Sequence, residues 1–539
     1  MAVIQTKVNT QTDSYKKNRE ELLDLISKIN ELEDKVHLSS NKKAALFAKR
    51  GQLLPRARLQ LLLDPGASFI ELSTLAGFGQ HDDDGEDNVY GAAIIVGIGF
   101  VENTRCMVYI NDAAIKAGTN MPHAYEKLRR AQEIARAARL PFICLVQSGG
   151  GNLLLQHLGF NLAGHRFKSQ AEASAAGIPQ ITVVHGASTA GGAYIPGMSD
   201  YVVMVKDKAR AYLAGPPLLK AATGEIAEEE ELGGAEMHAR ESGLAEYLAE
   251  DDAHAIEMAR EVVKSLHWNE RLPLSQATPY KEPRYDIDEL CGIVPVDYKK
   301  PYDCREIIAR LVDDSDFVEF KANYDGFTIC GFAEIEGQAC AFIGNNGPIT
   351  NKGAAKSTQF IQLCCQANKP IIFLQNTTGF IVGVQHEQQG MIKNGAKLIQ
   401  AVANATVPKI TLNIGGAFGA GNYAMSGRSF EPEFLFAWPT NTLAVMGGEQ
   451  AATVMSIVYE NKQKANNQPI DEAFTAKRHQ EIIDYYGKVS SALYCTSVVW
   501  DEGIIDPRKS RRLLAELLDI VVRGRQTRLD SNTFGVARI

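Results

Sequence analysis

The sequence predicts a mixed α/β protein that contains two copies of one domain behind a helical arm. Two observations carry this prediction: a set of prolines, apolar strand-like runs and glycine-rich turns occurs twice in the same order, and a constant interval separates the two sets. The length of 539 residues alone would predict three or four domains of about 150 residues. The repeat replaces that expectation with two related domains of about 200 residues each.

The first set begins where a charged helical stretch ends at Pro141. The apolar run FICLVQS follows this proline, and a second run, QITVVH, follows Pro179. Both runs are short, apolar and rich in branched residues, which is typical of buried strands in a parallel sheet. The second run leads into the glycine-rich turn GASTAGGAY at residues 186–194, where a helix is expected to start.

The second set repeats this order. IIFLQN follows Pro370, KITLNI follows Pro408, and the turn GGAFGAGNY occupies residues 415–423. Each of these three features follows its counterpart in the first set at one and the same interval. Upstream, NDAAIKAG from Asn111 matches NNGPITNKG from Asn345, and there the interval is longer by five residues. The two copies therefore differ in length by five residues between these segments and the prolines.

A charged helical arm is expected over residues 14–62, because apolar residues recur there at helical spacing. They are Leu22, Leu23, Leu25, Ile26, Ile29 and Leu32. Such an arm either packs on its own chain or docks on another subunit, and we expect docking. Five prolines predict an extended linker over residues 267–303. The predicted parts are the arm (1–62), the N-terminal domain (63–266), this linker and the C-terminal domain (304–539).

Composition argues against several classes of protein. The net charge of −8 and a pI near 5.9 argue against nucleic-acid binding through bulk positive charge. The longest apolar stretch, around residues 89–101, is short and interrupted by glycine, so no membrane partner is expected. The first residues lack an apolar signal core, which predicts a cytoplasmic, bacterial protein.

The nine cysteines are scattered and form no C-x-x-C pair. We expect reduced, buried thiols and no metal site. Neither a catalytic cysteine nor a disulfide framework is expected from this pattern.

The two glycine-rich turns are the candidate functional feature. Each follows a buried strand and opens a helix, so each offers backbone N–H groups that no acceptor within the helix satisfies. Glycine lets a ligand approach these groups closely, an arrangement that suits an oxygen which becomes anionic during a reaction, such as a thioester enolate. The alternative is that the glycines only permit tight packing of helix on strand. Because the turns are matched, we favour the oxyanion function.

Other catalytic patterns are missing from the sequence. There is no P-loop and no nucleophile elbow, and neither turn has the dinucleotide-binding fingerprint. His185 precedes the first turn inside an apolar run, and we interpret it as a core histidine rather than a base. The chemistry is therefore expected to depend on backbone N–H groups and on a base that a cofactor supplies.

Long segments of the chain resemble the carboxyltransferase (beta) subunits of biotin-dependent acyl-CoA carboxylases. The segments are TAGGAYIPGMSD, YLAGPPLLKAATGE, EELGGAEMHARESG, AEDDAHA, QNTTGFIVG, KNGAKLIQAVA, GGAFGAGNYAMSGR and VMGGEQAA. The pattern is most similar to the group of 3-methylcrotonyl-CoA and geranyl-CoA carboxylases, over about residues 45–515.

The resemblance implies a fold, a reaction and partners. The fold is a tandem duplication of crotonase-like (ClpP/crotonase) α/β domains. The reaction moves a carboxyl group from carboxybiotin to an acyl-CoA: carboxybiotin releases CO2, the ureido anion takes the acidic proton of the acyl-CoA, and the enolate attacks CO2. The biotin is carried by an alpha subunit with biotin carboxylase and biotin carrier domains. Beta dimers within an α6β6 assembly are implied, with the two ligands meeting at the dimer interface.

The resemblance also assigns residues to roles. The amides of Gly191 and Gly192 match the oxyanion hole for the acyl-CoA enolate, and those of Ala420 and Gly421 match the hole for the biotin ureido oxygen. Further substrate-binding candidates are Ser148, Gly149, Gly150, Lys116, Lys127, Arg129, Arg130, Ala190 and Gly164. Further cofactor-binding candidates are Thr378, Gly379, Phe380, Phe418 and Gly419. No metal ligand is implied.

Departures from the family pattern bear on the substrate. The usual D-S-G-G-A reads QSGGG at residues 147–151, and the segment 115–132 differs from the usual CoA-contacting sequence. The basic residues of that segment are candidate phosphate contacts, with a solvated helix face as the alternative. Small residues within 153–167, among them Gly159 and Gly164, provide room for a longer acyl chain. We therefore favour a geranyl-like substrate over 3-methylcrotonyl-CoA.

Three alternatives stay open at this stage. The substrate could be propionyl-CoA or acetyl-CoA. The same fold could carry a decarboxylase or hydratase reaction, for which no pair of carboxylates is evident in the sequence. The chain could also be a non-catalytic assembly subunit whose glycines are structural.

Overall fold

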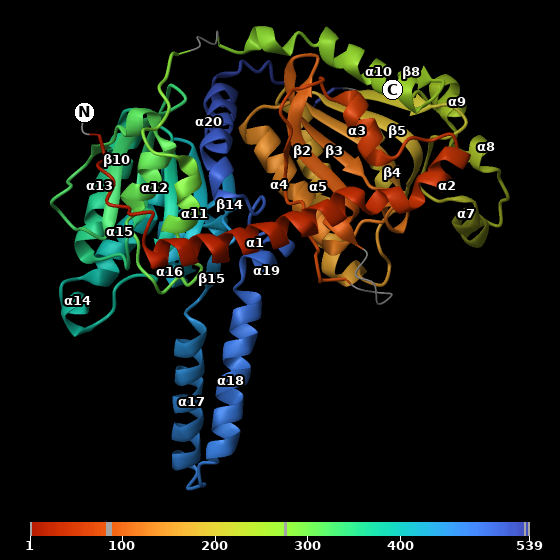
Figure 1. The fold of residues 1–539 in the computed structure, drawn as a ribbon. Helices are drawn as coiled ribbons and strands as arrows, with labels where there is room; N and C mark the ends of the chain where they lie inside the picture. Colours follow the sequence, from red (N-terminus) through yellow and green to blue (C-terminus); the bar gives the residue numbers. More distant parts are fainter. Residues whose placement is uncertain (1–2, 82–88, 274–277, 533–534, 537–539) are drawn as a thin grey trace. The chain divides into compact units, whose positions relative to one another are not determined.

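The computed structural model describes residues 3–81, 89–273, 278–532 and 535–536 (Figure 1). The chain divides into two compact units, and each contains one copy of the repeat. The first-copy unit comprises residues 30–275 with short C-terminal segments, 497–499 and 520–539. The second-copy unit comprises residues 1–29, 276–496 and 500–519. The domain boundaries predicted above stay a prediction.

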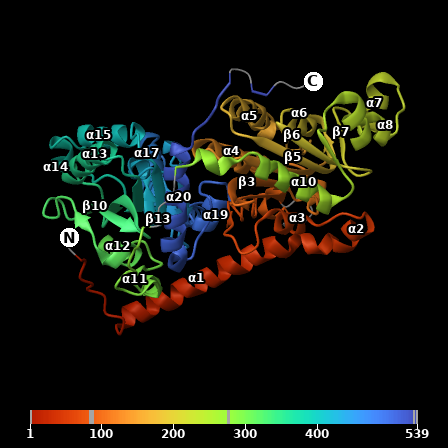
Figure 2. The same ribbon diagram turned by 90° about the horizontal axis from the view of Figure 1, so that it is seen from above.

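The first-copy unit is built on an eight-stranded sheet with the order β1-β2-β3-β4-β5-β6-β8, with β7 paired to β5. The strands are β1 (Ile70–Glu71), β2 (Ile94–Val101), β3 (Thr104–Asn111), β4 (Phe142–Ser148), β5 (Gln180–Thr189), β6 (Tyr201–Val205), β7 (Arg210–Tyr212) and β8 (Tyr247–Ala249). From β3 to β6 neighbouring strands run parallel. Helices α4 (Pro122–Ala137), α5 (Gln156–Ala175) and α10 (Asp252–Ser265) belong to this unit (Figures 1 and 2).

The second-copy unit repeats this topology in a seven-stranded sheet with the order β14-β13-β12-β11-β10-β9, with β15 paired to β13. The strands are β9 (Val318–Glu319), β10 (Thr328–Ile335), β11 (Gln338–Asn345), β12 (Ile371–Thr377), β13 (Lys409–Phe418), β14 (Phe434–Ala437) and β15 (Thr442–Ala444). Helix α13 (Asn351–Gln366) corresponds to α4, and α15 (Met391–Ala403) packs against α13. The predicted duplicated α/β fold is confirmed.

The predicted strands form because each apolar run is buried over its whole length. All residues of β4, β5 and their counterparts β12 and β13 are buried except near their carboxyl ends. Continuous burial is expected of central parallel strands that are covered on both faces. The prolines before these strands lie at strand starts, where no ladder N–H is needed. The carbonyls of Pro179 and Pro408 still accept hydrogen bonds from the strand alongside.

The five-residue difference between the copies falls in the loop that precedes α4 and α13. β3 ends at Asn111 and α4 begins at Pro122, whereas β11 ends at Asn345 and α13 begins at Asn351. The first copy therefore has the longer loop, and this loop carries Lys116.

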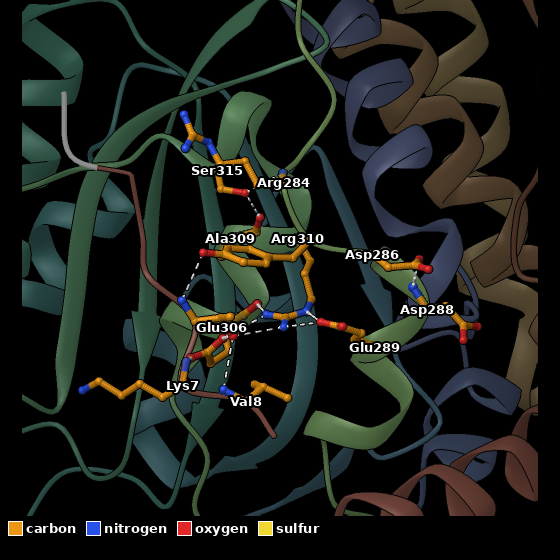
Figure 3. Close-up of polar contacts among 12 residues, drawn as sticks. Lys7, Val8, Arg284, Asp286, Asp288, Glu289, Glu306, Ala309, Arg310 and Ser315 are labelled. Carbon is orange, nitrogen blue, oxygen red and sulfur yellow. Dashed lines mark hydrogen bonds and ion pairs between the residues drawn. The ribbon is translucent and has the colours of Figure 1, made fainter. Parts of the chain in front are cut away.

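The N-terminal arm is helical, as predicted. It contains α1 (Asp13–Leu38), α2 (Ala44–Lys49) and α3 (Pro55–Leu62). The segment before α1 is fixed in the second-copy unit by ionic and hydrogen-bonded contacts (Figure 3). Glu306 accepts from the Lys7 amide at 2.7 Å and from Arg310 at 2.9 Å, and Arg310 also pairs with Glu289.

The predicted linker is only partly extended. Residues 287–289 and Leu290–Ile293 (α11) are helical, with Leu290 and Cys291 fully buried, because this segment packs into the second-copy unit. Residues 274–277 lie outside the described part of the chain.

Two long helices complete the second-copy unit. Helices α17 (Gly448–Ala465) and α18 (Glu472–Val489) pack on each other and extend away from their sheet (Figure 1). Among the described helices, none combines the length and apolar character that a membrane span requires. The remaining helices are α6 (Tyr194–Gly197), α7 (Pro216–Thr223), α8 (Glu229–Gly233), α9 (Ala235–Met237), α12 (Cys304–Leu311), α14 (Val384–Gln388), α16 (Gly419–Ala424), α19 (Ala492–Ser497) and α20 (Ser510–Gln526).

Candidate active site

The first glycine-rich turn lies at the carboxyl end of β5. A short helical turn, Ala190–Ala193, follows the strand directly and continues into α6. Ala190 and Gly191 are exposed, and Gly192 is half-buried. Ala190 has a φ of +53°, a left-handed conformation that is unusual for a residue with a Cβ. Such strain is often found at functional sites.

The predicted residues of the SGGG segment come together beside this turn. Ser148 pairs with Ser188 in the sheet, so the turn after β4 begins next to the end of β5. The Ser148 hydroxyl donates to the Gly118 carbonyl at 2.7 Å and accepts from the Gly150 amide at 3.1 Å. The Gly149 amide donates to the Ala117 carbonyl at 3.1 Å. The longer loop of the first copy therefore lies against the SGGG turn, with Lys116 one residue before this contact.

The second glycine-rich turn has the same construction at the equivalent place in its copy. Gly419 has a φ of +55°, as Ala190 has in the first copy, and Gly379 matches Gly150 with φ values of +107° and +98°. The Thr377 hydroxyl accepts from the Gly379 amide at 3.2 Å, as Ser148 does in the first copy. Ala420 is exposed and Gly421 is buried.

The candidate glycines of the two turns have different amounts of space around them. A Cβ on Gly421 would lie only 2.8 Å from the Gly379 Cα, so close approach of two backbones requires glycine there. Gly191 and Gly192 have no such neighbour: a Cβ would lie 3.7 Å from Phe167 and 3.4 Å from Ser188, respectively. Neither has a positive φ. Tight packing therefore explains Gly421 and leaves the first turn open for a ligand.

The second-copy cofactor candidates lie around the same backbone contact. Gly379 faces the Phe418 carbonyl, where an added Cβ would be 3.3 Å away, and Phe380 packs near Gly395 of α15. Thr378, which precedes Gly379, is exposed. The Phe418 ring is buried and lies 5.0 Å from the Tyr298 ring, measured between centroids.

The three basic candidates on α4 are engaged elsewhere. Lys127 is only 2% exposed and donates to the carbonyls of Gly91 and Ile94 at 3.2 and 2.9 Å. Burial lowers the pKa of Lys127 to about 8. Arg129 pairs with Glu126 and Glu133, and Arg130 is buried and pairs with Glu133. The expectation that Lys127 contacts a phosphate is not compatible with this placement, because its ammonium points into the protein.

The two small residues expected to make room for an acyl chain have different surroundings. A Cβ on Gly159 would lie 2.7 Å from the Tyr125 ring, so this glycine accommodates packing of α5 on α4. Gly164 lies on α5 with open space around its Cβ position. Only Gly164 can leave room for a ligand.

His185 belongs to a buried charged network behind the first turn. Its Nδ1 lies 2.7 Å from the Asp252 carboxylate, which also accepts from Arg58 at 3.0 Å. Arg58 donates to Gln147 at 2.8 Å, and so the network joins β4, β5, α3 and α10. Within the described part of the chain, His185 Nε2 has no hydrogen-bond partner.

The charges of this network are fixed. Burial, with the charge of Arg58, lowers the pKa of His185 to about 4, so the ring is neutral at pH 7. Burial alone would raise the pKa of Asp252, but the hydrogen bond from His185 and the charge of Arg58 hold it at about 2. His185 is thus a core residue, as expected, and a neutral donor to Asp252.

Sequence reasoning missed Arg58 and Asp252 as parts of the site's support. Asp252 stands within the AEDDAHA segment, where the family resemblance gives it no role. All nine cysteines are unpaired and eight are buried, as expected. Among the described residues, no group of three or more His, Cys, Asp or Glu could hold a metal ion.

Comparison with known proteins matches this architecture to one family. Residues 47–533 match the carboxyl transferase domain family. The chain therefore belongs to the carboxyltransferase family, and the prediction of a carboxyltransferase beta subunit of the biotin-dependent acyl-CoA carboxylases is confirmed.

Individual relatives cover nearly the whole chain. The solved beta subunit of geranyl-CoA carboxylase from P. aeruginosa is 51% identical, covers 100% of both chains and has a TM-score of 0.94. The probable mitochondrial methylcrotonoyl-CoA carboxylase beta chain of Drosophila melanogaster is 43% identical over 100% of this chain and 95% of its own length. A probable biotin-dependent acyl-coenzyme A carboxylase beta2 subunit of Mycobacterium tuberculosis is 45% identical over 91% of each chain.

Proposed function

We propose that this subunit transfers a carboxyl group from biotin on a partner subunit to a branched, unsaturated acyl-CoA of the geranyl-CoA type. The observation that carries the proposal is the pair of matched turns, each with an exposed residue at its start, in a chain that is similar throughout to geranyl-CoA and methylcrotonoyl-CoA carboxylase beta subunits. Two oxyanion sites are what this reaction requires, since both the thioester and the ureido group develop negative charge on oxygen.

The first-copy turn is proposed to bind the acyl-CoA thioester. Nothing lies closer than 3.4 Å to the Cβ positions of Gly191 and Gly192, so a thioester oxygen can approach their amides and accept from them as it becomes an enolate oxygen. Ser148, Gly149 and Gly150 border this turn and shape the entry for the substrate. The buried charges of Asp252 and Arg58 keep the strand ends rigid beneath the turn.

The second-copy turn is proposed to bind the biotin ureido oxygen. Ala420, an exposed residue, and Gly421, a buried one, belong to the start of α16, where amides have no acceptor within the helix. Gly379 supports Gly421 by direct backbone contact. Bound carboxybiotin would supply both the carboxyl group and a ureido nitrogen that accepts the acidic proton of the acyl-CoA.

The donor that we propose for the CoA phosphates is Lys116 rather than the α4 residues. Lys116 lies on the longer loop of the first copy, which the SGGG turn holds through the Gly118 carbonyl. Arg129 keeps a partly exposed guanidinium between two glutamates, so it is a weaker candidate.

The preference for a long acyl chain rests on α5 and on the residues that lead into it. Leu154 and Phe160 are 88% and 76% exposed shortly after the SGGG turn, and Gly164 has open space around it. Apolar groups in these positions suit a prenyl-type chain. The 51% identity to a geranyl-CoA carboxylase subunit supports the same preference.

We propose that the chain works in an assembly with an alpha subunit and with further beta subunits. Helices α17 and α18 expose several apolar side chains that a solvated surface would not need: Val454, Met455, Ile457, Val458, Phe474 and Tyr485. Exposed apolar surface of this kind marks protein interfaces. The α6β6 arrangement implied by the family is part of this proposal.

The test is co-expression with the biotin-carrying partner, followed by measurement of bicarbonate fixation on geranyl-, 3-methylcrotonyl-, propionyl- and acetyl-CoA. Higher kcat/KM on geranyl-CoA is expected, with methylcrotonyl-CoA next. Equal or better turnover of propionyl-CoA would overturn the substrate class. Absence of biotin-dependent fixation on all four substrates would overturn the reaction.

A further inference from the structure

A pocket lies next to the second glycine-rich turn, within the second-copy unit. It has a volume of about 400 Å³ and shares Phe418 with the turn. Its walls come from residues 296–299, from the segment before β15, and from α17 and α18. Aromatic and aliphatic groups line much of it, including Tyr298, Ile483 and Tyr486.

One polar side chain in this pocket lacks partners. Asn441 is 2% exposed, and neither its Oδ1 nor its Nδ2 has a hydrogen-bond partner among the described residues. A buried amide without partners costs about 1–3 kcal/mol for each unsatisfied group, so proteins rarely keep one unless something else occupies the site.

Hydrogen bonds of the backbone on both sides keep Asn441 at the wall of the pocket. Its amide donates to the Trp438 carbonyl at 3.0 Å. The preceding Thr440 hydroxyl donates to the Ile414 carbonyl at 3.2 Å, and the following Thr442 pairs with both Gly416 and Ser491. The residue that carries the unpaired amide is therefore fixed in its position along the pocket wall.

The chemistry of the amide selects the ligand. A primary amide presents one acceptor and one donor side by side, which pair with a flat edge that carries an N–H next to a C=O. A ureido ring has this edge, and its apolar second ring suits the wall formed by Tyr298 and Phe418. An adenine ring offers a similar edge, but it would come with the phosphates of CoA. The charged residues at the rim of the pocket are the two acids Asp297 and Glu449 and the one base Lys299. This net negative charge disfavours the binding of phosphates.

We propose that Asn441 is a specificity residue for biotin, whose ureido N–H and carbonyl it recognises in this pocket. The proposal rests on the proposed carboxyltransferase function and adds a side-chain contact to the backbone amides of Ala420 and Gly421. A primary amide can pair with the N–H and the carbonyl of a ureido edge at the same time, which gives Asn441 two contacts to the ligand.

The experiment measures binding of free biotin to the full-length chain by saturation-transfer NMR, and binding of the acyl-CoA in the same samples. Asn441→Leu is expected to weaken biotin binding by about 10-fold or more, as loss of two hydrogen bonds predicts. Acyl-CoA binding should be unchanged. Thermal stability should stay equal or rise, because the substitution removes an unpaired buried amide. Thr442→Val, in the same pocket, is the control and should leave biotin binding unchanged.

A second variant keeps the shape of the side chain. Asn441→Asp presents two acceptors, so it should bind 2-iminobiotin, whose guanidinium-type edge carries only donors, more tightly than biotin. The wild-type chain should show the opposite order. The proposal is wrong if both variants keep the wild-type affinity and ligand order, or if the Leu variant loses acyl-CoA binding to the same extent.

These outcomes distinguish failure of the Asn441 proposal from failure of the proposed carboxyltransferase function. If the wild-type holoenzyme carboxylates acyl-CoA and Asn441→Leu keeps its biotin affinity, the pocket assignment fails and the proposed function stands. If the wild-type chain neither binds biotin nor supports carboxylation, both fail.

Discussion

Lys127 and Lys356 occupy the same place in the two copies, and each buries its ammonium against backbone carbonyls. Lys127 donates to Ile94 at the start of β2, and Lys356 donates to Thr328 at the start of β10 at 2.7 Å. Each lysine ties the helix that follows the loop to the first long strand of its sheet. The pair is a structural feature of the duplicated fold, which explains why Lys127 is unsuited to hold a phosphate.

The burial of Lys127 makes the free energy of unfolding vary with pH in the alkaline range. Burial holds the pKa of Lys127 at about 8, below its ordinary value of 10.5, so the folded state binds fewer protons than the unfolded state between these values. Stability should therefore rise with pH across this window relative to a variant that lacks the amine. The free energy of unfolding of wild type minus that of Lys127→Met should increase by up to about 3 kcal/mol from pH 8 to 10.5.

Urea titrations at several pH values check this prediction. Lys356→Met should change in the same direction, because burial also lowers the pKa of Lys356. If the difference in the free energy of unfolding between wild type and Lys127→Met does not change with pH, the buried placement of Lys127 is wrong.

The network behind the first turn predicts a second pH effect, on the acid side. The folded-state pKa of His185 is about 4 against 6.5 when unfolded, so the unfolded state binds more protons between these values and stability falls as pH falls. In His185→Gln this contribution is absent. The stability advantage of wild type over the variant should shrink by up to about 3 kcal/mol between pH 6.5 and pH 4. Urea unfolding at several pH values measures it. An advantage that grows in acid would show that the ring is protonated in the folded state.

The open space at the first turn predicts a clean loss of activity. Gly191→Ala places a Cβ where no protein atom lies closer than 3.7 Å, so the melting temperature should not change. The Cβ occupies the space beside the amide, and kcat/KM for the acyl-CoA should fall about 10- to 100-fold. Gly197→Ala is the control, since a Cβ at this position would meet no atom within 4 Å. Full activity of Gly191→Ala in the holoenzyme would mean that the first turn does not contact the substrate.

The left-handed residues at the two turns predict opposite effects of exchanging them. Ala190→Gly should stabilise the chain by up to about 1 kcal/mol, because glycine adopts a φ of +53° without strain. Gly419→Ala should destabilise it by about 1–2 kcal/mol, since its Cβ would also lie 3.1 Å from the Val445 carbonyl. Thermal unfolding of both variants is the measurement. Shifts of the same sign would contradict the equivalence of the two positions.

The parts of the fold that can be predicted from the sequence are those with local signals. Prolines and glycines bound the central strands on both sides, so β4, β5 and their counterparts could be located from Pro141, Pro179 and the constant interval between the copies. The glycine-rich turns could be located in the same way. Their roles as amide donors remain a prediction, because the backbone geometry defines the open space at a turn but does not identify the ligand that binds there.

What could not be predicted depends on partners far away in the chain. Whether a lysine on α4 faces solvent is decided by carbonyls 33 and 36 residues earlier, which no local pattern reveals. Gly159 has no room for an acyl chain because Tyr125, on another helix, fills the space. Arg58 and Asp252 lie 194 residues apart in sequence, and neither residue alone indicates a buried pair. Such contacts follow from packing and not from spacing.

The five extra residues before α4 also indicate when the two copies became different in function, relative to the duplication. A duplication reproduces its template residue for residue, so a difference in length arises only after the two copies separate. The long loop that places Lys116 beside the SGGG turn has no counterpart in the second copy, where α13 starts six residues after β11 ends. Immediately after the duplication, the loops before α4 and α13 therefore had the same length. The difference in loop length on which the proposed CoA contact depends arose later than the repeat itself.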